Sequence, residues 1–358
     1  MSNQITDLNH NLPTSSKLND WYKSIAIVRT DVQRKDFASE EAFIAERECI
    51  ARSEQVAEMI RSQGVECHVL AANKHLSDNL IKTHPDLCLN FVDTVRGSGA
   101  LASGIPGIFE LLRLPYLGSG TLALSLNSNK FLCKTLLENW DIPTPRYQLL
   151  RSSGQDLEYG LRYPLVLKLN EEHGSVGIDS TSVVTNERDL RSKVKELLGI
   201  YQQPVLVEEF IEDAIELTAV VIDSKQRKVF LSERSFVKPK NAEFKLLTFE
   251  KKWATDLGNP EEVEYRKVSI DYPNVISSIK QMVKKAFDVL RMDDFARFDI
   301  MVDRYRGVYI IDANANPSLG PESSIVLSGA VNGVGVVPLM NEIFKSPRVG
   351  RKDNKGNF

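Results

Sequence analysis

Two apolar segments near the C-terminal end carry polar side chains at alternate positions. Ala296–Val302 and Val308–Ala313 flank the turn residues Arg304–Gly307, a pattern that predicts a β-hairpin. Residues two apart on a strand share one face, so the hairpin gathers two carboxylates, amides and a guanidinium in one patch. The members of this patch are Arg297, Asp299, Asp312, Asn314 and Asn316.

The side chains next to this patch decide between two interpretations. On a solvated hairpin, such residues would form an ordinary ion pair. Here Phe298, Ile300, Ile310 and Ile311 flank them, which predicts a deep location where unpaired charge is costly. Carboxylate and amide oxygens suit Mg²⁺, which takes few carboxylates together with phosphate oxygens. The sequence therefore predicts a magnesium site on this hairpin.

A second set of residues suits phosphate binding. Lys168 lies at the end of the predicted strand Tyr163–Leu169, and the small-residue loop His173–Gly177 follows. A lysine with several backbone N–H groups is one way to hold phosphates. Glu208–Ile211, after an apolar strand, offers backbone groups to a flat base. Alone each signal is weak, because Gly-Ser loops are common turns and the last segment also reads as an ordinary strand end.

The first third of the chain predicts a parallel sheet. Strands are expected at Ser24–Val28, Glu66–Leu70 and Asp86–Val92, and Ser39 caps a long helix that ends at Gln63. Strand, helix and strand in this order imply a right-handed crossover between parallel strands.

The rest of the chain predicts a lid and an antiparallel region. We expect a helix over Leu122–Trp140, then a strand–loop–strand–helix unit that ends near Ile200. From Pro204 longer strands follow, and Lys238–Arg266 is expected to be a long loop. The predicted fold class is α/β with an α+β C-terminal part. The expected boundaries are a disordered tail at 1–20, an N-terminal domain at 21–117, a lid at 118–203, a C-terminal domain at 204–348 and a loose tail at 349–358.

Composition excludes several classes of partner. The 358 residues carry a formal charge of −3, which argues against nucleic acid and anionic membranes. We find no run of roughly 18–20 apolar residues that would span a bilayer, and no apolar secretion signal. Four widely spaced cysteines suit neither a zinc site nor a disulfide framework, so a reducing, cytoplasmic location is expected.

The order of motifs resembles that of the D-alanine–D-alanine ligases, a group of ATP-grasp enzymes. The resemblance runs from Asp86 to Phe344. It rests on LPYLGSG, Asn129-Lys130, LVLKLN, the glycine loop, VLVEEFI, Glu216-Leu217-Thr218, ARFDIMV and IIDANANPSLGPES. It implies an ATP-grasp fold, ATP with Mg²⁺ (Mn²⁺ as an alternative), phosphorylation of a carboxylate and displacement of phosphate by an amine. Dimers are common in the family, so the resemblance also allows a homodimer.

The resemblance assigns roles by motif position. Nucleotide contacts are expected from Lys130, Lys168, Gly174, Ser175, Val176, Gly177, Glu208, Glu209, Phe210, Ile211 and Glu216, with the segment from Glu208 as adenine hinge and Glu216 at the ribose. Metal ligands are expected to be Asp299, Asp312 and Asn314. Catalytic contacts are expected from Arg297 at the oxyanion, Lys252 at the γ-phosphate and Ser323 near the second substrate.

The chain also departs from the family. Asp312 stands where a glutamate is usual, and Ser318 where a glycine is usual. The N-terminal segments Ser24–Arg34 and Asn90–Gly104 lack the family's amine-binding glutamate and its histidine-glycine motif. The ATP machinery is therefore kept, while the first-substrate pocket differs, which argues against a role in peptidoglycan synthesis.

These departures lead to a function hypothesis. We expect a ligase that joins an amino acid, through its amine, to a first substrate other than D-alanine. Arg96, with Ser98 and Ser103, is the expected first-substrate contact, because a guanidinium suits a carboxylate. Ser318 and Ser324 are further substrate candidates. The segment NFVDTVRGSGALASGIPG is similar to the mycosporine-forming ligases, which install an amino acid on a ring ketone as an imine.

Two alternatives stay open. One is a dipeptide ligase, either for D-alanine or with a relaxed choice of amino acid. The other is a nucleotide-binding protein with weak or no catalysis, which Asp312 and Ser318 would favour. A NAD-dependent oxidoreductase is excluded, because the first strand–helix junction has no glycine fingerprint.

Overall fold

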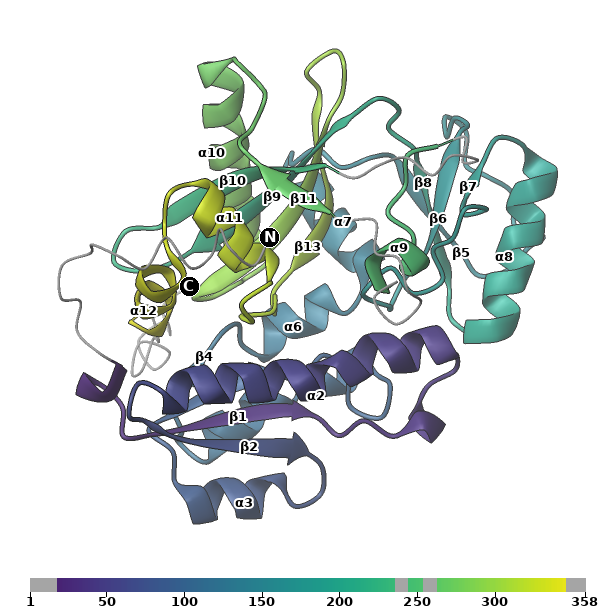
Figure 1. Cartoon of the computed structure of the whole chain (residues 1–358). Helices are drawn as coiled ribbons and strands as arrows, with labels where there is room; N and C mark the ends of the chain where they lie inside the picture. Colours follow the sequence, from purple (N-terminus) through teal and green to yellow (C-terminus); the bar gives the residue numbers. More distant parts are fainter. Residues whose placement is uncertain (1–17, 236–243, 254–262, 346–358) are drawn as a thin grey trace.

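The structure is a computed structural model that describes residues 18–235, 244–253 and 263–345 of the 358-residue chain. The described residues form three β-sheets (Figure 1). Of the predicted tails, 1–17 and 349–358 lie outside the described residues, as do parts of the predicted loop at 238–266. Residues 18–20 of the N-terminal tail, which we predicted to be disordered, form the short 3₁₀-helix η2 (Leu18–Asp20), and Leu18 is buried.

The N-terminal sheet is parallel, as the strand–helix–strand pattern predicts. Its strands run in the order β2-β1-β3-β4. Their bounds are β1 Ser24–Thr30, β2 Glu66–Ala72, β3 Leu87–Phe91 and β4 Tyr116–Leu117. The helices of this part are α2 Glu40–Arg61, α3 Leu76–Thr83, α4 Gly99–Ala102 and α5 Ile105–Leu111. The predicted cap on α2 is confirmed, since the hydroxyl of Ser39 accepts a hydrogen bond from the backbone N–H of Ala42 at 3.1 Å.

The middle sheet is antiparallel and runs in the order β5-β8-β6-β7. Its strands are β5 Tyr147–Leu150, β6 Leu165–Leu169, β7 Val183–Val184 and β8 Val205–Glu209. Helix α8 (Glu187–Tyr201) is capped by the side chain of Asn186, which accepts a hydrogen bond from Asp189 N at 3.0 Å. Because β8 pairs with β6, this sheet crosses the domain boundary predicted at residue 204.

The third sheet carries the predicted hairpin. Its order is β11-β10-β9-β12-β13. The strands are β9 Ile215–Ile222, β10 Lys228–Ser235, β11 Glu264–Arg266, β12 Phe295–Val302 and β13 Val308–Asn314. In the hairpin Arg297 pairs with Asn314 and Asp299 with Asp312, and the register shifts between Asp299 and Ile300. This register puts the predicted metal ligands side by side.

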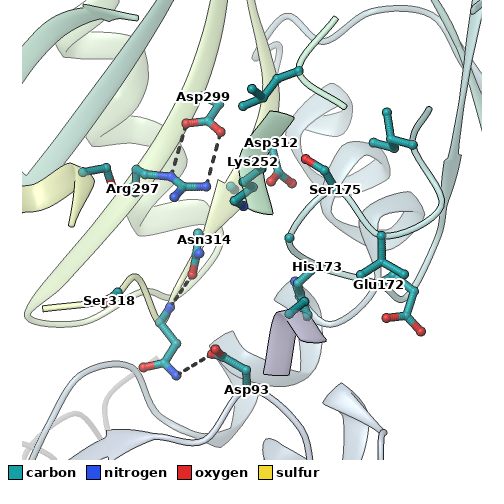
Figure 2. Close-up of a pocket in the computed structure, with 18 of the residues that line it drawn as sticks. Asp93, Glu172, His173, Ser175, Lys252, Arg297, Asp299, Asp312, Asn314 and Ser318 are labelled. Carbon is teal, nitrogen blue, oxygen red and sulfur yellow. Dashed lines mark hydrogen bonds and ion pairs between the residues drawn. The ribbon is translucent and has the colours of Figure 1, made fainter. Parts of the chain in front are cut away.

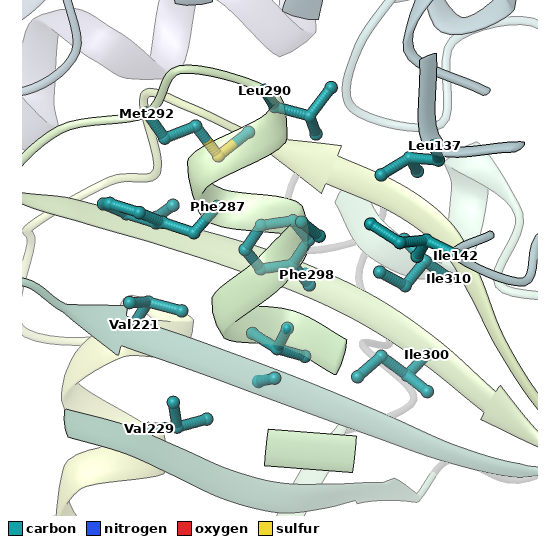
Figure 3. Close-up of a cluster of buried hydrophobic side chains, with 14 of the residues drawn as sticks. Leu137, Ile142, Val221, Val229, Phe287, Leu290, Met292, Phe298, Ile300 and Ile310 are labelled. Carbon is teal, nitrogen blue, oxygen red and sulfur yellow. The ribbon is translucent and has the colours of Figure 1, made fainter. Parts of the chain in front are cut away.

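One face of the third sheet packs on the amphipathic helix α10 (Pro273–Val289). Figure 3 shows the ring of Phe298, from β12, near Phe287 of that helix. Both side chains are fully buried. A fully buried phenylalanine contributes roughly 1.5–3 kcal/mol of burial free energy, so this cluster anchors the hairpin that carries the site residues.

The prediction of one continuous helix over Leu122–Trp140 is wrong. The segment forms two helices, α6 (Thr121–Asn127) and α7 (Lys130–Asn139). The side chain of Asn129 accepts a hydrogen bond from Leu132 N at 3.0 Å and so caps the second helix. The backbone N–H of Lys130 donates a hydrogen bond to the carbonyl of Asn170 at 3.0 Å. This bond joins the start of α7 to the end of β6.

Further short helices were not predicted. Within the expected loop, Phe249–Trp253 forms α9, and Ser324–Val331 forms α11 in the glycine-rich region. The last helix of the described residues is α12 (Val336–Phe344). No single helix in the described ranges is long and apolar enough to cross a membrane, although α11 and α12, bent by 120°, pass that test of length and composition as a pair.

Candidate active site

Residues from all three sheets line one cavity of about 610 Å³. The N-terminal sheet contributes the segment after β3 and one face of α2. The middle sheet contributes β6, β8 and the loop after β6. The third sheet contributes β9, β10 and the β12–β13 hairpin, and α9 and the start of α11 complete the wall. Most of the site residues expected from the sequence face this cavity, the exceptions being Arg96, Ser98 and Gly177.

The hairpin brings Asp299 and Asp312 together at one wall. Asp299 is 6% exposed, and its Oδ1 lies 3.2 Å from Nε of Arg297. Figure 2 shows both oxygens of Asp299 paired with Arg297, and Oδ1 makes this ion pair without accepting a hydrogen bond within the described residues. Burial opposes ionisation of Asp312, but Lys130 and Arg297 outweigh it and hold the pKa of that carboxyl below its ordinary value. The carboxylate of Asp312 is therefore charged near neutral pH.

A second arginine joins this wall, and sequence reasoning missed it. Nη2 of Arg234, on β10, lies 2.9 Å from Oε2 of Glu216, and its Nη1 lies 3.5 Å from Oδ2 of Asp299. Arg234 thus links the glutamate expected at the ribose to the carboxylate expected at the metal. The sequence offered no clear signal, because Arg234 stands in the polar end of β10, between Glu233 and Ser235.

The opposite wall carries the lysines expected at the phosphates. Nζ of Lys168 lies 2.9 Å from Oε2 of Glu208, and Nζ of Lys134 lies 3.3 Å from its Oε1. Burial raises the pKa of Glu208, but the two lysines outweigh that effect and lower it overall. Burial lowers the pKa of Lys134. The side chain of Glu208 is therefore committed to lysines, and only its backbone is available to a base. Lys130 donates to the carbonyl of Glu172.

The loop after β6 presents backbone groups to the cavity. Gly174 and Ser175 both have positive φ, 68° and 65°, a turn of the kind that exposes successive N–H groups to an anion. Beside them, burial and Lys130 lower the pKa of His173 to about 4, so this imidazole is neutral at pH 7. Gly177 instead packs inside the lid, where a Cβ would lie 2.8 Å from Cδ1 of Leu169.

Lys252 reaches the cavity from α9. Its ammonium group shares the cavity with the guanidinium of Arg297 (Figure 2). Desolvation by the surrounding cavity walls and this neighbouring positive charge lower the pKa of Lys252 to about 8, although part of the side chain is open to solvent. The amine is therefore mostly protonated at pH 7 and loses its charge in the mildly alkaline range.

Only some of the residues predicted to contact the substrates line the cavity. Ser103, Ser318, Ser323 and Ser324 line the cavity. Arg96 does not line it and is exposed, with φ of 52°. Ser98 does not line it either, because its hydroxyl caps α4 by accepting from Leu101 N at 3.3 Å. The structure thus does not bring the expected guanidinium to the cavity.

Comparison with known proteins decides the family. A model of the D-ala D-ala ligase C-terminus matches residues 136–345, more than half of the chain. The chain belongs to the D-alanine–D-alanine ligase family. Membership confirms the expected ATP-grasp fold and the class of ATP-dependent, ADP-forming ligases. The N-terminal sheet, where the sequence departs from the family pattern, lies outside the matched range.

Individual relatives agree with this placement. The chain is 27% identical to the D-alanine–D-alanine ligase of Polaromonas naphthalenivorans, over 88% of this chain and 94% of that protein. It is also 27% identical to the uncharacterized protein y4sG of Sinorhizobium fredii, over 67% of this chain and 68% of that one. The fold is similar to the crystal structure of the Bacillus anthracis D-alanine–D-alanine ligase complexed with ATP, with a TM-score of 0.66, 18% identity and coverage of 93% and 99%.

Proposed function

We propose that this family member phosphorylates an acceptor oxygen with ATP and then couples an amino acid to the activated carbon through its amine. The acceptor oxygen attacks the γ-phosphorus and ADP leaves; the amine then attacks the carbon, loses a proton, and phosphate leaves. The first substrate is a molecule other than D-alanine, and mycosporine-glycine is the candidate we favour. The observation that carries the ligase proposal is the single cavity that gathers cations, carboxylates and backbone N–H groups.

The hairpin residues fit a divalent cation. Asp299, Asp312 and Asn314 would hold Mg²⁺, or Mn²⁺ in its place, because they supply two carboxyl groups and an amide oxygen, and Oδ1 of Asp299 accepts no hydrogen bond within the described residues. When bound, the ion would neutralise charge on the phosphates.

The chain's own cations serve the phosphoryl transfer. Lys130 and Lys168 stand at the wall beside the glycine loop, and Arg297 and Lys252 stand at the hairpin wall. A transferring phosphoryl group placed between these walls would meet positive charge from both sides. Such fixed charges need no reorganisation during the reaction and account for much of the catalysis in enzymes of this type.

The lowered pKa of Lys252 gives a pH prediction. Only the protonated amine attracts a phosphate, so kcat/KM for ATP should fall as the pH rises through about 8. Lys252→Arg keeps its charge, and its kcat/KM should hold to higher pH. Initial-rate measurements between mildly acidic and alkaline pH check this. Identical alkaline falls in both proteins would show that another group titrates.

A second variant tests the departure at the hairpin. Asp312→Glu restores the side chain usual in the family, and we expect activity equal to or above that of the wild type. Steady-state turnover with saturating ATP and Mg²⁺ measures this. Complete inactivity would mean that the pocket is built for the shorter carboxylate.

The competing function is a dipeptide ligase. The printed names of several relatives, among them the ligases of Polaromonas naphthalenivorans and Carboxydothermus hydrogenoformans, favour it. The departures in the N-terminal sheet favour a different first substrate, because that part of the chain lacks the amine-binding residues of the family pattern.

One experiment separates the two. Phosphate release from ATP and Mg²⁺ is measured across a panel of amino acids, each with and without mycosporine-glycine, and products are identified by mass. Release only with mycosporine-glycine, and a product heavier by one amino acid less water, supports the imine-forming ligase. Release with amino acids alone and a dipeptide mass would retire that substrate. No release in any mixture, with ATP still bound, would favour a nucleotide-binding protein.

A further inference from the structure

The wall of the cavity made by α2 and the segment after β3 has no part in the phosphate chemistry. It presents three groups that we call the acidic wall: Glu46, Asp93 and Thr94. They come from the region of the chain that lies outside the family match. They also belong to the part of the chain in which the sequence lacks the family's first-substrate residues.

The first carboxylate of the acidic wall is fixed by hydrogen bonds. Glu46 projects from α2 and is only 8% exposed. Its Oε1 accepts from Thr94 N at 3.2 Å and from the hydroxyl of Thr30. The backbone after Thr94 turns tightly, and a Cβ on Gly97 would lie 2.1 Å from the carbonyl oxygen of Asp36. The position of this carboxylate is therefore set by the fold.

The second carboxylate is joined to the metal-binding hairpin. The amide nitrogen of Asn316 donates to Oδ1 of Asp93 at 3.2 Å and to the carbonyl of Val92 at 3.3 Å. The backbone N–H of the same Asn316 donates to Oδ1 of Asn314 at 2.8 Å (Figure 2). A group that binds at Asp93 is thus held at a fixed distance from the residues that we place at the reacting phosphate.

The acidic wall is short of positive charge. Burial, with the nearby charge of Asp93, raises the pKa of Glu46 to about 7, and burial raises the pKa of Asp93 as well. Two cations face Asp93, Arg52 and Lys252, but Arg52 is also bound to Glu48 on its own helix. Simultaneous ionisation of Glu46 and Asp93 is therefore unfavourable.

An unsatisfied hydroxyl is an independent sign of a ligand. The side chain of Thr94 is 8% exposed, and its hydroxyl makes no hydrogen bond of regular geometry with the residues that the structure describes, although it lies close enough to Glu46 to oppose the rise in the pKa of that carboxyl. Leaving such a group unpaired costs free energy, which a bound molecule would recover. The wall thus offers two carboxylates and a hydroxyl to a group that donates hydrogen bonds.

We propose that Glu46, Asp93 and Thr94 bind the hydrogen-bond donors of the first substrate and select it. This assignment rests on the proposed function and names the class of molecule: one that turns N–H or O–H groups to this wall and its acceptor oxygen to Arg297. An ammonium group and a pair of ring hydroxyls share this chemistry. The acidic wall takes the place of Arg96, which lies away from the cavity.

Thr94→Val is the most discriminating variant. It keeps the size of the side chain and the backbone bond to Glu46, and it removes only the unpaired hydroxyl. We expect the KM for the first substrate to rise about 10-fold, as for one lost hydrogen bond of about 1.4 kcal/mol, with unchanged KM for ATP and an unchanged or raised midpoint of urea unfolding. A purely structural threonine would instead show a lowered midpoint and an unchanged KM.

Asp93→Asn and Glu46→Gln complete the set, with Glu58→Gln, an exposed glutamate on the same helix, as the matched control. Mycosporine-glycine and D-alanine serve as first-substrate probes for phosphate release. A loss confined to D-alanine in Asp93→Asn identifies an ammonium site, and a loss with mycosporine-glycine identifies a hydroxyl site. If the KM for both probes is unchanged in all three variants, the acidic wall does not bind the first substrate, and the ligase proposal is unaffected. No release by the wild type with either probe overturns both.

Discussion

Asp299→Asn is expected to lower turnover by at least about 30-fold, or ~2 kcal/mol, while ATP still binds. The substitution keeps the size of the side chain and removes its charge. Asp299 pairs with Asp312 across the hairpin and is the proposed metal ligand whose Oδ1 accepts no hydrogen bond within the described residues, so loss of its charge would weaken the binding of a metal ion. Turnover and ATP affinity are measured at several Mg²⁺ concentrations.

The arginines around Asp299 make the choice of variant important. Alanine would leave Arg297 and Arg234 facing each other across the space of the lost carboxylate, and the fold would suffer as well. Asparagine limits this effect, and urea unfolding of the variant verifies that the fold is intact. Asp271→Asn, at an exposed position away from the cavity, is the control. Wild-type turnover in Asp299→Asn would remove this residue from the metal site.

Glu208→Ala is expected to destabilise the fold by about 3–5 kcal/mol, because it breaks a buried ion pair and leaves charge without a partner. Glu208 is 1% exposed and lies between Lys134 and Lys168, of which Lys134 is itself buried. Urea unfolding at pH 7 measures the change. Glu212→Ala, at an exposed position four residues further on, is the control. A loss below about 1 kcal/mol would mean that this cluster is not charged in the folded protein.

The same ion pair gives a pH dependence of stability. The pKa of Glu208 is lowered in the folded state, so the unfolded chain binds a proton more readily. The stabilisation is therefore present above the ordinary glutamate pKa of about 4.3 and is lost as the pH falls through the lower folded value. Unfolding free energies measured from pH 7 downward should converge for the wild type and Glu208→Gln at low pH.

The hairpin could be predicted because its signal is local. Alternating positions fix which side chains share a face, and Arg297 and Asp299 accordingly meet Asn314 and Asp312 across the strands. The shift in register after Asp299 could not be predicted, because it depends on how β12 also fits β9. The boundaries of the domains and the roles of the site residues stay predictions.

The acidic wall could not be predicted from the sequence pattern. Glu46 lies in a charged stretch of α2 and resembles a solvent-facing residue. Only the folded chain shows that it turns inward to meet Thr94, a contact between positions 48 residues apart. Arg96 was a plausible choice by chemistry, but the tight turn at Gly97 leaves it exposed. Long-range contacts of this kind decide the pocket and are invisible to periodicity.

The interruption between α6 and α7 has a consequence for anyone who redesigns the chain. A continuous helix would satisfy local propensity better, and substitutions of Ser128 and Asn129 by alanine would encourage it. The break, however, lets Lys130 N bond to Asn170 and lets Phe131 N bond to the side chain of the same asparagine, at 2.9 Å. Lys130 is therefore held against the end of β6, where the glycine loop begins. A continuous helix would lose these hydrogen bonds to Asn170 and displace Lys130 from the cavity wall. We expect such a variant to have a more regular helix and lower activity.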